Sequence, residues 1–175
     1  MKLMFASDIH GSAYYAELLK DRYYEEKAEK LILLGDLLYH GPRNDLPKDY
    51  APKKVIEILN GMKNELLCVR GNCDTEVDQM VLDFPILADY AVMYLDGKAV
   101  YITHGHHYNP ENLPPMKDGD ILMNGHTHIS ADENIKTSFG SVRYLNPGSV
   151  SIPKNGTGHS FMVYENGVFT LKNLI

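Results

Sequence analysis

The chain of 175 residues has room for one domain, and at this size about 70 % of the unfolded surface is buried on folding without disulfides. Hydrophobic residues make up 44 % of the sequence and charged residues 23 %, which excludes a disordered or collagen-like protein. With 17 basic and 23 acidic residues the net charge is −6, which disfavours binding to long nucleic acids and to anionic membranes.

No apolar run approaches the ~18–20 residues of a membrane span, and the N-terminal segment lacks the apolar region of a signal peptide. The two cysteines, Cys68 and Cys73, are expected to be reduced thiols. Together these features predict a cytoplasmic protein.

The first half of the chain alternates between short apolar runs and helical patterns. The runs predict three buried strands, at 2–7, 31–35 and 66–70. Apolar residues at helical spacing predict a helix over 13–30 and a second one around 55–59, with Gly61 as its C-cap. Glycines and prolines make 40–51 a loop. This order of elements is typical of a βαβαβ unit.

The second half contains two hairpin signals, because apolar runs flank the dipeptides Asp96-Gly97 and Asn166-Gly167. The predicted strands are 90–95, 98–103, 121–124, 142–145, 161–165 and 168–171. These runs resemble antiparallel meanders. We therefore predict one α/β domain over residues 1–175, with two sheets packed on each other and helices outside.

Five polar clusters follow predicted strands: Asp8-Ile9-His10-Gly11, Gly35-Asp36, Gly71-Asn72-Cys73-Asp74, His104-Gly105-His106 and Gly125-His126-Thr127-His128. The carboxyl ends of strands in open α/β sheets are where ligands bind. Asp8 with His10, and His126 with His128, are spaced to point to the same side of an extended segment. One such pair alone is as consistent with a structural role, as a loop-capping Asp or a hydrogen-bonded His, as with a ligand site. Five clusters in chain order favour a ligand site.

In this order, D-x-H, G-D, G-N-x-D, a His before Gly, and G-H-x-H resemble the motifs of the calcineurin-like metallophosphoesterase superfamily. The small size, GNCD and GHTH resemble its YfcE-type branch of bacterial phosphodiesterases. The resemblance covers essentially the whole chain. It implies a four-layer αββα sandwich of two mixed sheets flanked by helices, with a dinuclear metal site at the strand ends.

The resemblance also implies the ligands of the two ions. One metal would be held by Asp8, His10, Asp36 and His128, and the other by Asp36, Asn72, His104 and His126, with the Asp36 carboxylate bridging them. Such a mixed nitrogen and oxygen set suits Mn, Fe, Zn, Co or Ni, and the lack of Cys ligands argues against a closed structural zinc site. Manganese is the first choice because the family commonly uses it.

The implied activity is hydrolysis of a small phosphodiester by a hydroxide that bridges the two metals, with Asp36 and His104 in the catalytic centre. One alternative is a non-catalytic scaffold, like the retromer subunit of this superfamily, but that subunit's site is degraded and every ligand position here is filled. The other is a nucleotide phosphatase or nuclease. The acidic charge argues against polynucleotides as substrates, but it does not argue against mononucleotides.

Many superfamily members have His where this chain has Cys73, and that His is thought to protonate the leaving group. A thiol is a weaker acid near neutrality than imidazolium, so Cys73 is either a catalytic residue of altered role or a space-filling one.

Asp74 is expected to orient His104, and His106 and His107 are candidates for substrate contact or solvated loop residues. The turn Asn146–Ser149 is expected to be structural. Hairpin edges or Tyr faces could pair subunits in a homo-oligomer.

Overall fold

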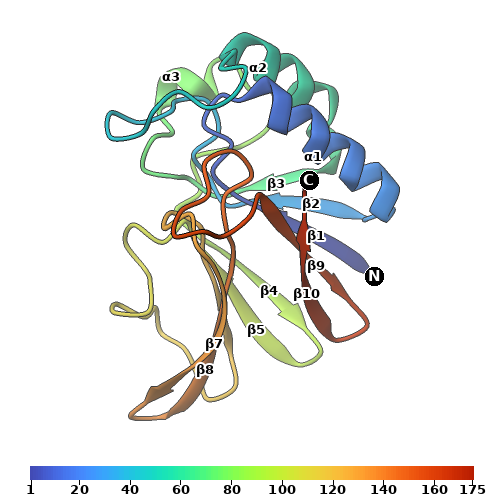
Figure 1. Cartoon of the computed structure of the whole chain (residues 1–175). Helices are drawn as coiled ribbons and strands as arrows, with labels where there is room; N and C mark the ends of the chain where they lie inside the picture. The colour runs from blue at the N-terminus through green and yellow to red at the C-terminus, as the bar shows by residue number, and fades with distance from the viewer.

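The computed structural model describes residues 1–175 and shows two five-stranded sheets packed face to face (Figure 1). The first sheet has the order β10-β9-β1-β2-β3 and consists of β1 (Lys2–Ala6), β2 (Lys30–Leu33), β3 (Leu66–Cys68), β9 (Ser160–Glu165) and β10 (Val168–Asn173). The second has the order β4-β5-β6-β8-β7 and consists of β4 (Ala91–Leu95), β5 (Lys98–Ile102), β6 (Ile121–Met123), β7 (Ser130–Thr137) and β8 (Gly140–Pro147). Both sheets mix parallel and antiparallel pairs, so the predicted sandwich of two mixed sheets with helices is confirmed.

The first half of the chain forms the predicted βαβαβ unit. Strands β1, β2 and β3 are parallel neighbours, and helices α1 (Ala13–Glu26) and α2 (Pro52–Gly61) connect them. Helix α1 begins after Ser12, whose Oγ accepts a hydrogen bond from the amide of Tyr15. Its C-cap is Lys27, in the left-handed conformation, so the helix is shorter than the predicted 13–30. Gly61 lies inside the last turn of α2 instead of capping it, and the short helix η1 (Lys63–Glu65) follows.

The prediction of antiparallel meanders for the second half is only partly right. The β4–β5 hairpin is antiparallel, but β5, β6 and β8 pair in parallel because long connections carry the chain back before each next strand. The β9–β10 hairpin forms as predicted and joins the first sheet beside β1. Strand β7 was not predicted because its sequence, SADENIKT, is polar, as suits an exposed edge strand. The short helix α3 (Glu76–Gln79) was also missed.

Alternation along β1 divides the interior into layers. Met4 and Ala6 belong to a cluster of 25 buried apolar residues under the helices, while Leu3 and Phe5 belong to a cluster of 14 between the sheets. The outer face of the second sheet carries a cluster of only three, which is packed against side chains of the loop after β5. In this chain the fourth layer of the sandwich is therefore a loop.

The loops that follow β1, β2, β3, β5 and β6 gather at one edge of the sandwich, at the left of Figure 1. Backbone hydrogen bonds join the loops within each sheet, from the amide of Asp8 to the carbonyl of Gly35 and from the amide of Gly125 to the carbonyl of His104. The amide of His126 crosses between the sheets to the Asp8 carboxylate, at 3.1 Å. None of the helices is both long and apolar enough to cross a bilayer.

Candidate metal centre

The loops at this edge hold several non-glycine residues in the left-handed backbone conformation, and five of these residues lie in the predicted motifs. Their φ angles are 60° for Asp8, 49° for His10, 58° for Asp36, 65° for His126 and 62° for His128. This conformation costs an ordinary L-residue about 1–2 kcal/mol. Such strain persists only where the surrounding fold fixes it, and it concentrates at functional sites. All five are residues that the motifs single out as metal ligands.

The first group of side chains consists of Asp8, His10 and His128, and all three are buried. Asp8 Oδ1 lies 3.5 Å from His10 Nε2 and 3.2 Å from His128 Nε2, and the two imidazole nitrogens are 3.2 Å apart. Three donor atoms therefore converge on one point, from a carboxylate and two imidazoles.

The second group consists of Asp36, His104 and His126, with Asn72 beside it. His104 Nε2 lies 3.4 Å from Asp36 Oδ2, 3.2 Å from His126 Nδ1 and 3.1 Å from Asn72 Oδ1. All seven predicted ligands are thus brought together, although they come from five separate loops.

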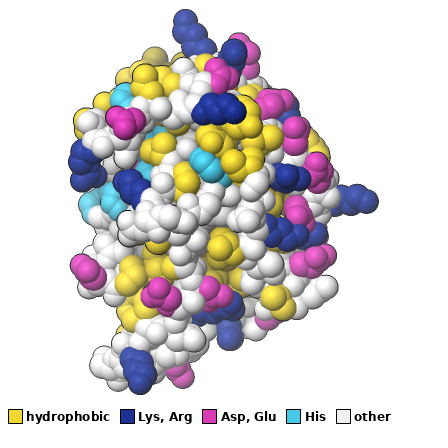
Figure 2. All heavy atoms as spheres, viewed as in Figure 1, with side chains coloured by type: hydrophobic (Ala, Val, Ile, Leu, Met, Phe, Trp, Pro, Cys, Tyr) yellow, Lys and Arg dark blue, Asp and Glu magenta, His cyan; other side chains and the backbone are white.

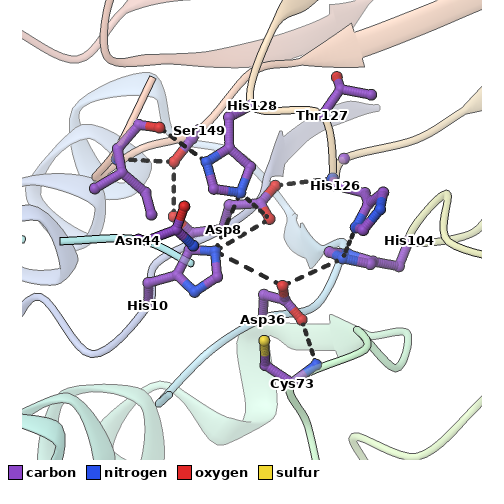
Figure 3. A network of polar contacts seen from close by, with 12 residues as sticks. Asp8, His10, Asp36, Asn44, Cys73, His104, His126, Thr127, His128 and Ser149 are labelled. Atoms are coloured by element: carbon purple, nitrogen blue, oxygen red, sulfur yellow. Dashed lines mark hydrogen bonds and ion pairs between the residues drawn. The ribbon is translucent and has the colours of Figure 1, made fainter. Parts of the chain in front are cut away.

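Asp36 lies between the two groups (Figure 3). Its Oδ2 is 3.7 Å from His10 Nε2 on one side and 3.4 Å from His104 Nε2 on the other. Its Oδ1 accepts a hydrogen bond from the backbone amide of Cys73, at 2.8 Å. One carboxylate oxygen is held by the protein, and the other faces both groups at once.

Backbone carbonyls fix the orientation of three of the imidazoles. The Nδ1 of His10 lies 2.7 Å from the carbonyl of Tyr39, that of His104 2.6 Å from Leu34, and that of His128 2.8 Å from Ile152. Because a carbonyl only accepts, each Nδ1 carries the proton and each Nε2 offers its lone pair to the site. This arrangement is typical of imidazoles that bind metals.

The expectation that Asp74 orients His104 is wrong, because the carbonyl of Leu34 occupies that position. The Asp74 carboxylate instead accepts hydrogen bonds from the amides of Asp36, Leu37 and Gly71, at 2.7–2.9 Å. It lies in the turn after β3 and reaches the turn after β2, so it holds those two loops together. Burial is the main cause that raises the pKa of Asp74.

The buried charges make the site suited to cations. Burial favours the neutral form of Asp8, but the neighbouring imidazoles of His10 and His128 outweigh this effect and hold its pKa well below the ordinary value. The Oδ1 atom of Asp8 is fully buried and has no hydrogen-bond partner. A buried carboxylate oxygen beside two lone pairs of imidazole nitrogens fits a bound divalent cation.

Two glycines allow the loops to approach one another at Asp36. A methyl group at Gly35, where φ is +96°, would lie 2.4 Å from the amide nitrogen of Gly71. A methyl group at Gly71 would lie 2.1 Å from Asp36 Oδ1. Glycine is required at both positions because any side chain would displace the Asp36 carboxylate.

Cys73 lies at the rim of the site, half-buried, with its thiol near Gly41. Burial, together with the negative charge of Asp36, raises the pKa of the Cys73 thiol to about 12. The thiol is therefore protonated at neutral pH. Cys68 is buried in β3, and its thiol donates to the carbonyl of Val69.

The rings of His106 and His107 pack against each other at a tilt of 46°, and both residues, with His104, line a cavity of about 330 Å³ beside the metal centre. Burial, with the neighbouring His104, lowers the pKa of His106 to about 4. The cavity is also lined by Asp89, Thr103, Gly105, Tyr108 and Asn112. The centroid of the His106 ring lies 5.4 Å from that of His104 and 6.2 Å from that of His126, so His106 borders the second ligand group.

Sequence reasoning missed the part played by the segment after β8. The hydroxyls of Ser149 and Ser151 both donate to the carbonyl of Asp8, at 2.9 Å each, and the amide of Val150 donates to the carbonyl of Ser7. These bonds hold the left-handed backbone of Asp8 from the other sheet. The glycine-containing turn before Ser149 was the one available signal, since it ends a strand on the same side as the other clusters.

Comparison with known proteins agrees with this geometry. Residues 1–167 match the family model for the calcineurin-like phosphoesterase superfamily domain. The chain is 47 % identical over 171 residues to Phosphodiesterase YfcE of Escherichia coli strain K12, which covers 98 % of this chain and 91 % of that protein. Phosphodiesterase MJ0936 of Methanocaldococcus jannaschii is 24 % identical over 156 residues, or 85 % of this chain and 83 % of that one.

The solved structure of the E. coli phosphoesterase YfcE superposes with a TM-score of 0.93 at 46 % identity, over 99 % of this chain and 93 % of that chain. The fold, the ordered motifs and the family model all lead to one assignment. The chain belongs to the calcineurin-like phosphoesterase superfamily.

Proposed function

We propose that this protein is a metal-dependent phosphodiesterase that hydrolyses a small phosphodiester with the help of two divalent ions. Membership of a phosphoesterase family and the 47 % identity to a named phosphodiesterase support the class of reaction. The observation that carries the two-ion centre is the position of Asp36 Oδ2, which faces His10 at 3.7 Å and His104 at 3.4 Å.

In this proposal Asp8, His10, Asp36 and His128 hold one ion, and Asp36, Asn72, His104 and His126 hold the other. Such ions supply the positive charge that binds phosphoryl oxygens and lowers the pKa of a water molecule, so that it can act as the nucleophile. Manganese is the first candidate, with Fe, Zn, Co or Ni as alternatives of the same ligand preference.

The chain's own residues prepare the site for this chemistry. The carbonyls of Tyr39, Leu34 and Ile152 keep three imidazoles in the orientation that offers Nε2. Asp8 and Asp36 contribute two negative charges, which two divalent ions outweigh, so the centre attracts an anionic phosphodiester although the whole chain is acidic. The rigid loops hold these groups before substrate arrives, which is the main requirement for electrostatic catalysis of phosphoryl transfer.

The test is an assay of metal-stripped protein with bis(nitrophenyl) phosphate and nitrophenyl phosphate, with and without Mn²⁺. We expect turnover of the diester only after metal is restored, and much slower turnover of the monoester. Absence of metal-dependent turnover of both compounds contradicts the proposal and favours a scaffold of the same fold. A clear preference for the monoester favours a phosphatase.

The proposed setting is the cytoplasm, which suits the reduced thiols of Cys68 and Cys73.

A further inference from the structure

The cavity over the metal centre contains cationic side chains that have no part in the proposed hydrolysis. It is lined by five of the proposed ligands and by two cationic side chains, Arg43 and Lys154. Both residues are exposed, and neither side chain makes a salt bridge or a hydrogen bond within the chain. On the face drawn in Figure 2, Lys and Arg atoms lie beside the His side chains at the left edge.

Lys154 is fixed to the site through its backbone. Its amide donates to the carbonyl of His128 at 3.0 Å, and the neighbouring carbonyl of Ile152 accepts from His128 Nδ1 at 2.8 Å. The hydroxyl of Thr157 donates to the carbonyl of Lys154 at 2.8 Å and closes the loop. The loop that orients the His128 imidazole therefore also places Lys154 at the rim.

Arg43 belongs to a tight turn on the other side of the same rim. The amide of Asn44 donates to the carbonyl of Gly41, and its side-chain amide donates to the carbonyl of His40 at 2.8 Å. Gly41, where φ is +82°, lets this turn lie against the Cys73 thiol. Figure 3 shows Asn44 near His10, and Arg43 lines the same cavity as these two residues.

A simple diester leaves these two cations without a partner. Two divalent ions exceed the charge of Asp8 and Asp36 by two units, and a hydroxide and the single charge of a diester restore neutrality. Arg43 and Lys154 then add two positive charges that no group of the protein offsets. A ligand with a further anionic group is complementary to this arrangement.

The neighbouring cavity lined by His104 has the opposite character. It contains the carboxylate of Asp89 and no Lys or Arg. An additional anion is therefore favoured on the side of Arg43 and Lys154 and disfavoured on the side of Asp89.

We propose that Arg43 and Lys154 form a subsite for a second phosphate of the substrate, so that the preferred substrates are small phosphodiesters that carry a phosphate beyond the scissile one. Arg43 supplies a planar pair of donors for phosphate oxygens, and Lys154 supplies a point charge. This inference rests on the proposed function, because it needs the scissile phosphate to lie at the metal centre.

The test compares two diesters that differ only in the second phosphate. These are the nitrophenyl ester of thymidine 5′-phosphate and the same compound with a 3′-phosphate. We expect the Mn²⁺-loaded wild-type protein to prefer the 3′-phosphorylated ester by about tenfold in kcat/KM. The double variant Arg43→Gln, Lys154→Gln is expected to reduce this ratio to near one.

The matched control is Lys53→Gln, Lys136→Gln, which removes the same net charge from exposed residues of α2 and β7. It should keep the wild-type ratio, because the preference depends on position and not on total charge. Calorimetry with thymidine 3′,5′-bisphosphate and thymidine 5′-phosphate gives a readout independent of turnover, and the same difference in affinity is expected.

Equal kcat/KM for the two esters in the wild-type protein overturns the inference, as does a preference that survives in the Arg43, Lys154 variant. In either case turnover of both esters leaves the proposed function intact. Failure to hydrolyse either ester, with no metal-dependent turnover of bis(nitrophenyl) phosphate, contradicts the proposed function itself.

Discussion

The two ends of the sandwich use the same unusual backbone conformation for different purposes. At the end that carries the hairpin turns, Asp96, Gly97, Asn166 and Gly167 have φ angles of 50–84°, and all four are exposed. At the metal end, Asp8, His10, Asp36, His126 and His128 have φ angles of 49–65°, and four of them are buried.

This difference shows which interactions stabilise each set. The hairpin residues are the Asp-Gly and Asn-Gly pairs that a tight turn prefers, so local sequence is sufficient. No local preference places His10 or His128 in the left-handed region. Both are held by hydrogen bonds to other loops, from the amide of His10 to the carbonyl of Asp36 and from the amide of Lys154 to the carbonyl of His128. Changes at the metal end should therefore cost function, and changes at the hairpin end should cost only stability.

The largest effect is expected for Asp36→Asn. The amide keeps an oxygen for the Cys73 N–H bond but removes the charge that faces both ligand groups. We expect loss of bound metal and a fall in diester turnover on the order of a thousandfold. Metal content by mass spectrometry and steady-state kinetics measure both effects. Wild-type turnover in this variant shows that Asp36 does not bridge two ions.

Gly71→Ala should have the next largest effect. The new methyl group would lie 2.1 Å from Asp36 Oδ1, so the two loops must separate. We expect a loss of about 1–3 kcal/mol in the free energy of unfolding and at least tenfold weaker metal binding.

Gly61→Ala is the matched control, because nothing lies within 4 Å of a methyl group there. It should stabilise α2 by up to about 1 kcal/mol and leave metal affinity as it is. Equal metal affinities in the two variants contradict the close packing at Asp36.

Cys73→His should change selectivity more than overall rate. An imidazolium at the rim can protonate an alkoxide leaving group, whereas a thiol is a poor donor near neutrality. We expect phosphate release from glycerol phosphate to rise by about tenfold relative to diester turnover. Cys73→Ser serves as the control and should show no gain. Unchanged selectivity in the His variant counts against a role for this position in leaving-group protonation.

Gly97→Ala tests the other end of the molecule. The methyl group meets nothing within 4 Å, so only the backbone cost of φ +77° remains. We expect a loss of about 1 kcal/mol in the free energy of unfolding with diester turnover unchanged. Denaturant titration and the diester assay report these quantities, and a parallel loss of turnover would show that the two ends are coupled.

The smallest effect concerns Glu26, near the same end, which pairs with Lys2 and Lys172. Burial opposes ionisation, but the two lysines prevail and lower the pKa of Glu26 below its ordinary 4.5. Because the pKa of Glu26 is lower in the folded than in the unfolded state, its ionised form stabilises the protein above pH 4.5. This contribution is lost as the pH falls through the folded-state pKa. Glu26→Gln should therefore cost about 0.5–1 kcal/mol at pH 7. Chemical denaturation at pH 7 and pH 3 should show that difference vanish at the lower pH.

The same contrast explains what could be predicted from the sequence. The βαβαβ unit and both hairpins follow from periodicity and turn residues, which are local signals. All seven proposed ligands were named by the resemblance of the ordered motifs to those of the calcineurin-like superfamily. The parallel pairing of β5, β6 and β8 was missed because it depends on long connections without a local signature.

Side-chain direction was also beyond sequence reasoning. The Asp74 carboxylate binds backbone amides of two loops, and the carbonyl of Leu34 orients His104. Neither contact could be predicted, because each forms only after separate loops have come together. The same is true of Arg43 and Lys154, which come from distant segments and line the same cavity.

The most direct test of the two-ion centre is a calorimetric titration of metal-stripped wild-type protein with Mn²⁺, checked by metal analysis of the dialysed product. The position of Asp36 between two groups of donors predicts two Mn²⁺ ions per chain, and Asp36→Asn should retain fewer than two. Binding of a single ion, or of none, by the wild-type protein would contradict the account.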